Sequence, residues 1–208
     1  MLAMPPVQTR IRIAPATNQD RAAVYRLRHQ VYARELHQHA ENPEELLTDA
    51  LDGFNDYITA SLDGEIVGFV SLTPPGHGRY SIDKYLARQE LPFPSDDRLY
   101  DVRLLTVAAE YRGRPIAGLL MYAALRWIES RGGTRIVAIG RREILGMYLK
   151  VGFEPLGREI QSGSVRFELM TATTSSMRES LARYKPAMRK VESGIDWQLG
   201  IPFHPPAI

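Results

Sequence analysis

Residues 100–128 read YDVRLLTVAAEYRGRPIAGLLMYAALRWI and decide the fold of this chain. They divide into an apolar, β-rich run (100–107), a polar turn (108–115) and a run with apolar side chains at helical spacing (116–128). The stretch therefore predicts a strand, a turn and a helix in direct succession. The first turn of such a helix has backbone N–H groups without partners and partial positive charge, and Arg112, Gly113 and Arg114 lie just before it. We predict an anion site at this turn, although a strand–turn–helix unit that binds nothing has the same outline.

The segments around this stretch complete a mixed α/β pattern. Strands are predicted at 10–14, 57–62, 65–72, 134–139 and around 164–170, and helices at about 18–36, 80–91, 141–150 and 177–190, the last broken at Pro186. The Asp63–Gly64 pair between two of the strands predicts a type I′ hairpin turn. The order predicts an α/β (α+β) fold whose central sheet begins antiparallel, becomes parallel near residues 100–128 and is flanked by helices. Such a change of direction tends to leave a crevice at the carboxyl ends of the strands.

Composition excludes several functions. The chain has 208 residues, 44% of them hydrophobic, which is enough for one sizeable core. Its net charge of +2 gives no nucleic-acid signature, so we expect no nucleic-acid partner. Cysteine is absent, which excludes disulfides and thiolate catalysis. There is no apolar run long enough to span a membrane and no signal peptide, so we expect a soluble cytoplasmic protein.

The sequence predicts three regions. Residues 1–9 are rich in proline and expected to be loose, residues 10–170 form the domain, and residues 171–208 form a C-terminal helical and aromatic extension. Trp197 and Phe203 in the extension need burial. They can fold back on the domain, pack against a partner such as a second copy in a homodimer, or contact a neighbouring domain.

A group of histidines and one acid invites a metal interpretation. His29, His37, His39 and Glu41 lie close in sequence. His37 and His39, however, point to opposite sides of a strand and lie far apart on a helix. No second cluster completes a ligand set, so we expect solvated loop histidines and no metal.

Two motifs carry a resemblance to a known family. R-G-R-P-I-A-G (112–118), after an L-x-V strand, resembles the acyl-coenzyme-A loop Q/R-x-x-G-x-G/A of the GNAT acyltransferase superfamily, with Arg112 first and Ala117 last. Tyr148 to Phe153 (YLKVGF) is similar to the family's Y-x-x-x-G-F motif. The resemblance covers about residues 101–170. It implies a GNAT-like mixed, mostly antiparallel central sheet that is parallel at the acyl-donor crevice.

The same resemblance implies an N-acyltransferase that moves an acetyl or other acyl group from acyl-CoA to the amine of a small molecule. The donor-binding residues it implies are Leu105, Thr106 and Val107 beside the pantetheine, and Arg112, Gly113, Arg114, Pro115, Ile116, Ala117, Gly118 and Arg141 around the phosphates. Tyr148 is the implied general acid. Asp101 is our candidate base, acting directly or through water, and a solvated strand end explains it equally well.

Pro115 departs from the loop pattern, because the family usually has glycine there. Proline donates no N–H, so one phosphate contact is lost, at a cost of about 1.5–3 kcal/mol. A thioester of acyl carrier protein, with a single phosphate, tolerates that loss better than coenzyme A does. The donor is therefore open between acyl-CoA and an acyl carrier protein.

The N-terminal half resembles a second group, the autoinducer synthases and N-acyl amino acid synthases that use acyl carrier protein. Arg28 and Tyr32 fit that group's first helix, where the acceptor is expected, and Asp52 and Asp56 fit its acidic pair loosely. Ser71 stands where that group has arginine. On the following strand the arginine is out of step, with Leu104 at its place and Arg103 one residue earlier. A third hypothesis, beside the two kinds of acyltransferase, is a non-catalytic binding module with the same fold.

Overall fold

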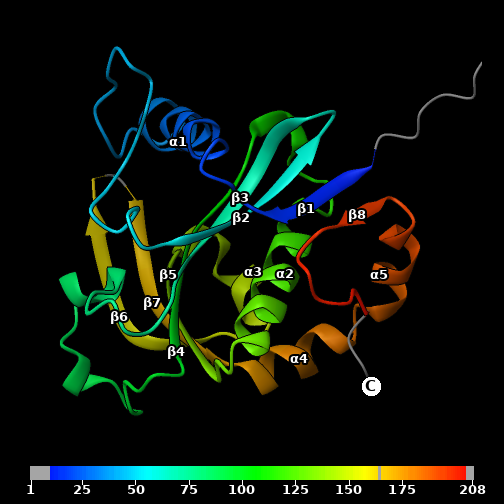
Figure 1. The fold of residues 1–208 in the computed structure, drawn as a ribbon. Coiled ribbons are helices and arrows are strands. Elements are labelled where there is room, and N and C mark those ends of the chain that lie inside the picture. The colour runs from blue at the N-terminus through cyan, green and yellow to red at the C-terminus, as the bar shows by residue number, and fades with distance from the viewer. Residues whose placement is uncertain (1–9, 164, 205–208) are drawn as a thin grey trace, which may run out of the picture.

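A single twisted sheet crosses the molecule from end to end (Figure 1). The computed structural model describes residues 10–163 and 165–204, so the expectation for residues 1–9 lies outside the described part. The eight strands are β1 (Ile11–Pro15), β2 (Asp56–Leu62), β3 (Glu65–Thr73), β4 (Leu99–Val107), β5 (Arg135–Arg141), β6 (Glu154–Ser162), β7 (Val165–Thr173) and β8 (Ile195–Trp197). They lie in the order β6-β7-β5-β4-β3-β2-β1-β8. Pairing is antiparallel except between β4 and β5 and between β1 and β8, which confirms the predicted mixed sheet.

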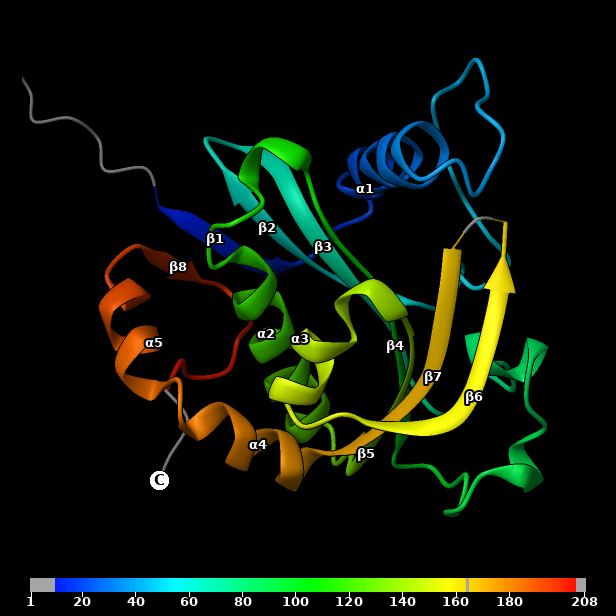
Figure 2. The ribbon, with the colours of Figure 1, turned by 180° about the vertical axis from the view of Figure 1, so that it is seen from behind.

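Helices cover both faces of this sheet. They are α1 (Arg21–His29), α2 (Ile116–Ser130), α3 (Leu145–Lys150), α4 (Thr174–Ala182) and α5 (Lys185–Glu192). Side chains alternate along a strand, so Tyr57 packs with α1 while Ile58 packs with α2 on the opposite face. Figure 2 shows α2, α3 and α4 together on the second face, with α1 across the sheet. Both faces of β2 and β3 are therefore shielded from water, which explains their nearly continuous apolar sequence.

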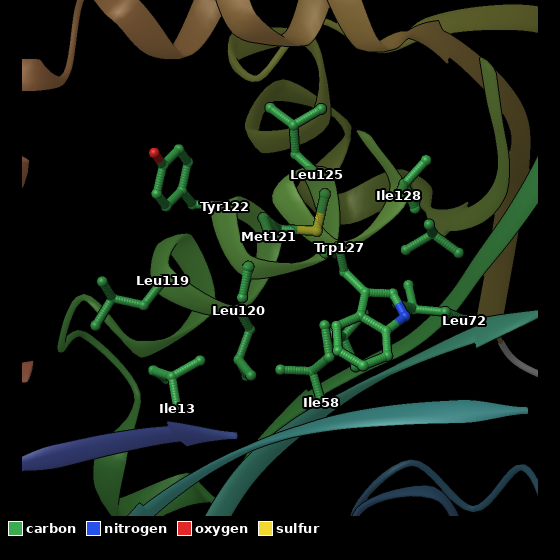
Figure 3. Close-up of a cluster of buried hydrophobic side chains, with 14 of the residues drawn as sticks. Ile13, Ile58, Leu72, Leu119, Leu120, Met121, Tyr122, Leu125, Trp127 and Ile128 are labelled. Carbon is green, nitrogen blue, oxygen red and sulfur yellow. The ribbon is translucent and has the colours of Figure 1, made fainter. Parts of the chain in front are cut away.

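The strand–turn–helix unit of residues 100–128 is the centre of this arrangement, as predicted. Its helix, α2, is buried along most of its length against the sheet, and Leu119, Leu120 and Ile128 are fully buried (Figure 3). Trp127 donates a hydrogen bond from Nε1 to Asp56 on β2, 3.2 Å away. Within the described residues, no helix is both long and apolar enough to cross a bilayer.

An irregularity in β4 creates the space for a site. The pairing of β3 with β4 passes from Ser71↔Arg103 to Phe69↔Thr106, so β4 carries an extra residue there. Leu104 lies within this bulge with φ of 56°, a conformation that bulky residues rarely adopt. Beyond residue 102, β4 no longer pairs with β5. The two parallel strands therefore separate at their carboxyl ends.

Several predicted elements need correction. Residues 80–91 do not form a helix: two short 3₁₀ turns occur at Ser81–Lys84 and Arg88–Glu90, the first closed by a hydrogen bond from Tyr80 N to the Asp83 carboxylate (2.7 Å). The helix predicted at about 18–36 changes at its end into the π-helical turn Gln30–Glu35. The predicted break near Pro186 is confirmed, because α4 ends at Ala182 and α5 begins at Lys185; Pro186 lies in the first turn of α5, where proline is well tolerated.

Two strands were not predicted. β6 is largely exposed and contains proline and glycine, so its sequence lacks the alternation of a half-buried strand. β8 is only three residues long.

The C-terminal extension folds back onto the domain. β8 pairs in parallel with β1, Ile195 opposite Ile11. The Trp197 and Phe203 rings lie 4.8 Å apart, and both contact the ring of Tyr122 on α2. The aromatic side chains of the extension thus pack within this chain, as in the first of the three alternatives; a homodimer through the extension stays an untested alternative.

Candidate active site

A crevice of ≈ 460 Å³ lies where β4 and β5 separate. Its walls come from β4, β5, the π-helical turn after α1, the loop before α2, and α3. Of the residues predicted from the sequence, it is lined by Tyr32, Leu105, Thr106, Val107, Arg112, Gly113, Ala117, Arg141 and Tyr148. Val31, Glu35, Leu36, Leu104, Ile139, Ile144, Met147 and Phe167 complete the lining. The structure therefore gathers most of the predicted donor residues around one space.

The loop at the N-terminus of α2 has the backbone that an anion site needs. Gly113 has φ of 86°, which glycine adopts without strain, and Pro115 is the residue just before the helix. Gly113, Arg114, Pro115 and Gly118 are exposed, whereas Ile116 is fully buried. Arg114, Pro115, Ile116 and Gly118 are not among the residues that line the crevice. Gly113 and Ala117 are thus the part of the loop that meets it.

Tyr148 lies on α3 with its ring half-buried at the inner end of the crevice. Its ring meets that of Phe153 edge-to-face, with centroids 5.9 Å apart. Gly140 on β5 lies under the Tyr148 ring, so closely that a Cβ there would be 2.6 Å from Cε2. Burial, with a smaller effect from Tyr32, raises the pKa of Tyr148, and Arg141 opposes the rise. The phenol therefore stays protonated at neutral pH and is able to donate a proton.

Asp101 does not line the crevice. Its side chain is fully buried, and both carboxylate oxygens accept hydrogen bonds from Ser81, one from the backbone N–H and one from Oγ at 3.0 Å. Burial raises the pKa of Asp101, and the Ser81 contacts and Arg103 counter it only in part. The structure places this carboxylate as an anchor for the turn at Ser81.

Arg28 belongs to a buried charge cluster. Its guanidinium binds Asp49 at 2.6 Å and Asp52 at 3.1 Å, and it is only 3% exposed. Arg103 also binds Asp49, and Tyr57 donates its hydroxyl hydrogen bond to Asp52. Burial would raise the pKa of Asp49, but Arg103 and Arg28 outweigh it and lower that pKa to about 2. We expected Arg28 to be available for an acceptor carboxylate; its two terminal nitrogens are already paired.

This cluster corrects the acidic pair expected from the sequence. The pair is Asp49 and Asp52, not Asp52 and Asp56, because Asp56 binds Trp127. Arg103, which is out of step in the sequence, reaches Asp49 from the residue just before the Leu104 bulge. The sequence signal available for this acidic pair was the D-x-x-D spacing of Asp49 and Asp52. The bulge at Leu104 has no corresponding signal in the sequence.

The histidines form no metal site in the part of the chain that the structure describes. No group of three or more histidine or acidic side chains among residues 10–163 and 165–204 could hold a metal ion. His29 is buried, and its Nε2 accepts a hydrogen bond from Asn42 N at 3.2 Å. Glu41 pairs with Arg34.

Comparison with known proteins identifies the family. The sequence model of the acetyltransferase (GNAT) family matches residues 21–153, and the chain belongs to this family. It is therefore an acyltransferase of the acyl-CoA-dependent kind. By sequence, no curated protein matches the chain.

Solved structures with the same fold include autoinducer synthases. The CoA-dependent acyl-homoserine lactone synthase BjaI, with SAM and isopentyl-CoA, has a TM-score of 0.71 at 17% identity, covering 93% of this chain and 95% of its own. The acyl-homoserine lactone synthase LasI has a TM-score of 0.67 at 12% identity, covering 94% and 98%. A putative N-acetyltransferase from Lactobacillus plantarum has a TM-score of 0.60 at 18% identity, covering 79% and 99%. At these identities the likeness concerns the fold.

Proposed function

We propose that this protein is an N-acyltransferase that binds acyl-CoA in the crevice between β4 and β5 and transfers the acyl group to the amine of a small molecule. The observation that carries the proposal is the separation of the two parallel strands into a crevice that is lined both by the loop before α2 and by Tyr148. A long ligand with an anionic end and a reactive thioester end can contact both of these features.

The donor fits the crevice by the chemistry of its walls. Past residue 102, β4 is no longer paired with β5, so main-chain groups of residues 105–107 on that side of the strand can hydrogen-bond with the pantetheine amides. The phosphates lie at Gly113 and Ala117, where the helix N-terminus supplies N–H groups and partial positive charge. Arg112 and Arg141 are the cationic side chains of the lining. Pro115 still removes one N–H donor, so affinity for coenzyme A is expected to be moderate.

The reaction requires two proton movements. The neutral amine nitrogen attacks the thioester carbonyl carbon, the C–N bond forms, the C–S bond breaks, and the thiolate takes a proton. Tyr148 supplies this proton, since its raised pKa keeps the phenol protonated. The proton lost by the amine passes to solvent in the crevice. Asp101 acts as base only through intervening groups, because Ser81 occupies both of its oxygens.

A second candidate is an autoinducer-type or N-acyl amino acid synthase. The charge cluster of Arg28, Asp49, Asp52 and Arg103 favours it, because it supplies the first-helix arginine and the acidic pair that the resemblance requires. The fold of BjaI also extends over the C-terminal extension, since it covers 93% of this chain. For this candidate the acceptor to test is SAM, which is present in the BjaI structure.

One assay separates these readings. Thiol release is followed with acetyl-CoA, a branched five-carbon acyl-CoA and an acyl carrier protein thioester, each with a panel of primary amines and with SAM. Release with acetyl-CoA and simple amines supports the first candidate, and release only with SAM supports the second. If thiol is released only from the carrier-protein thioester, the donor is an acyl carrier protein and not acyl-CoA. If no thioester is consumed and coenzyme A does not raise the melting temperature, the enzyme proposal is wrong and the binding-module reading stands.

A further inference from the structure

The mouth of the crevice is bridged by an ion pair. Arg112, in the loop before α2, binds Glu35, at the end of the π-helical turn after α1, with Nη2 and Oε2 2.6 Å apart. Both residues line the crevice. They are 77 residues apart in sequence, so the contact connects two otherwise separate walls.

Arg112 also binds the main chain of β4, the strand beside which the donor is expected. Its Nε donates a hydrogen bond to the carbonyl oxygen of Val107 at 3.0 Å. Val107 is the last residue of β4 and faces the crevice. The same guanidinium thus binds two groups. One is the Val107 carbonyl beside the expected pantetheine, and the other is the Glu35 carboxylate on the opposite wall.

We propose that Arg112 and Glu35 form a clasp that opens when the donor binds, Arg112 exchanging the Glu35 carboxylate for a donor phosphate. The inference rests on the proposed function. A guanidinium directs its N–H groups in one fixed fork, so those that bind Glu35 are not free for a phosphate. Glu35 also places a negative charge beside the anionic end of the donor, which disfavours binding while the clasp is closed.

The clasp is weak enough to open. The Arg112 side chain is 48% exposed and that of Glu35 is 27% exposed, and exposed ion pairs stabilise little because water and salt screen them. Opening therefore costs less than the phosphate contact gains. Glu35 ends a π-helical turn, and such turns are frequent at functional sites.

The test compares coenzyme A binding by Glu35→Gln and by a matched control. Glu110→Gln removes the same charge from a neighbouring exposed position, where no ion pair is formed among the described residues. At low ionic strength Glu35→Gln is expected to tighten coenzyme A binding about two- to five-fold, the range that an exposed pair supports, and Glu110→Gln by less. In an Arg112→Gln background the gain from Glu35→Gln should disappear.

Each other outcome overturns the clasp. Equal gains from the two glutamate variants, or a gain that persists without Arg112, would show only a general effect of charge. Weaker binding by Glu35→Gln would mean that Glu35 positions Arg112 for the donor.

A second measurement needs no donor. In the free chain, the Nη protons of Arg112 should give an NMR signal with slowed solvent exchange, because Nη2 binds Glu35, and Glu35→Gln should accelerate that exchange. Fast exchange of the Nη protons in the unaltered chain overturns the contact itself. If no variant binds coenzyme A, the proposed donor site fails, and the spectrum still decides whether the two walls are joined.

Discussion

Tyr148 is the residue whose environment best matches a chemical role. It is half-buried in an apolar wall, beside Tyr32 and Arg141, at the inner end of the crevice. Burial raises its pKa, so the neutral phenol persists well above physiological pH. A proton donor for a thiolate needs this property.

We therefore predict that Tyr148→Phe lowers kcat by about 100-fold, the lower range for loss of a general acid, and leaves coenzyme A affinity within two-fold. The ring and its contact with Phe153 are kept, so the fold is preserved. Tyr85→Phe is the control, because Tyr85 is exposed and is not among the residues that line the crevice. Steady-state kinetics and calorimetric binding check both. Unchanged kcat in Tyr148→Phe would remove it as the acid.

Asp49 is the residue that links charge to stability. Its pKa is lowered to about 2 by Arg103 and Arg28, against the effect of burial. A depressed carboxyl pKa contributes stability that is fully present above the unfolded value near 3.8 and is lost as pH falls through about 2. The contribution is about 2 kcal/mol.

Asp49→Asn should lower the free energy of unfolding at pH 7 by about 2 kcal/mol, because it leaves the buried Arg28 with one acidic partner. The gap between the variant and the unaltered chain should narrow between pH 4 and pH 2, where Asp49 itself becomes neutral. Urea unfolding across that range measures it. Asp97→Asn, at an exposed position, should change the free energy by less than about 0.5 kcal/mol. A pH-independent gap would contradict the assignment.

At the scale of elements, the site depends on how closely β5 and α3 approach. Gly140 on β5 permits that approach, since a Cβ there would lie 2.3 Å from Met170 Cε and 2.6 Å from Tyr148 Cε2. Gly146 on α3 has no atom within 4 Å of an added Cβ and has no positive φ. A substitution at Gly140 therefore tests the close approach, and the same substitution at Gly146 is its control.

Gly140→Ala should displace the Tyr148 ring, lower the free energy of unfolding by about 1–3 kcal/mol through overpacking, and reduce kcat more than ten-fold. Gly146→Ala should raise stability by about 0.5–1 kcal/mol, because alanine favours a helix. Thermal unfolding and turnover of the two variants provide the comparison. Equal behaviour of the pair would show that the Gly140 approach does not matter.

The elements also show what sequence could and could not predict. Apolar periodicity is a local signal, so the sequence predicts the helix at residues 116–128, and the Asp63–Gly64 turn has the positive φ values that its predicted type requires. The bulge was not predicted, because a leucine at positive φ is imposed by tertiary packing and Leu104 carries no turn signal. Because the bulge is not predictable, the ion pair of Arg103 with Asp49 beside it is not predictable either. These two residues are half of the charge cluster.

At the scale of the whole molecule, the C-terminal extension is part of the fold. Ile195 and Leu199 are buried, and Trp197 donates a hydrogen bond from Nε1 to the carbonyl oxygen of Ile201 at 2.7 Å. Sequence indicated that Trp197 and Phe203 needed burial but not where. Their partner on α2, Tyr122, is distant in sequence, and nothing local connects them.

Trp197→Ala should lower the melting temperature by about 5 °C, which corresponds to about 2 kcal/mol for a half-buried tryptophan in a chain of this size. Tyr85→Ala, which removes an exposed aromatic ring, should change it by less than about 1 °C. Differential scanning calorimetry measures both. A melting temperature unaffected by Trp197→Ala would mean that the extension only rests on the surface.

The parallel pairing of β8 with β1 has a consequence for the order of folding during synthesis. β1 is made before β2 and can pair with it early, but its other edge has no partner until Ile195–Trp197 are made. An open strand edge is a surface on which nascent chains can associate. β1 therefore completes its hydrogen bonding only after Ile195–Trp197 have been made, and until then its open edge is the surface that a chaperone would have to shield.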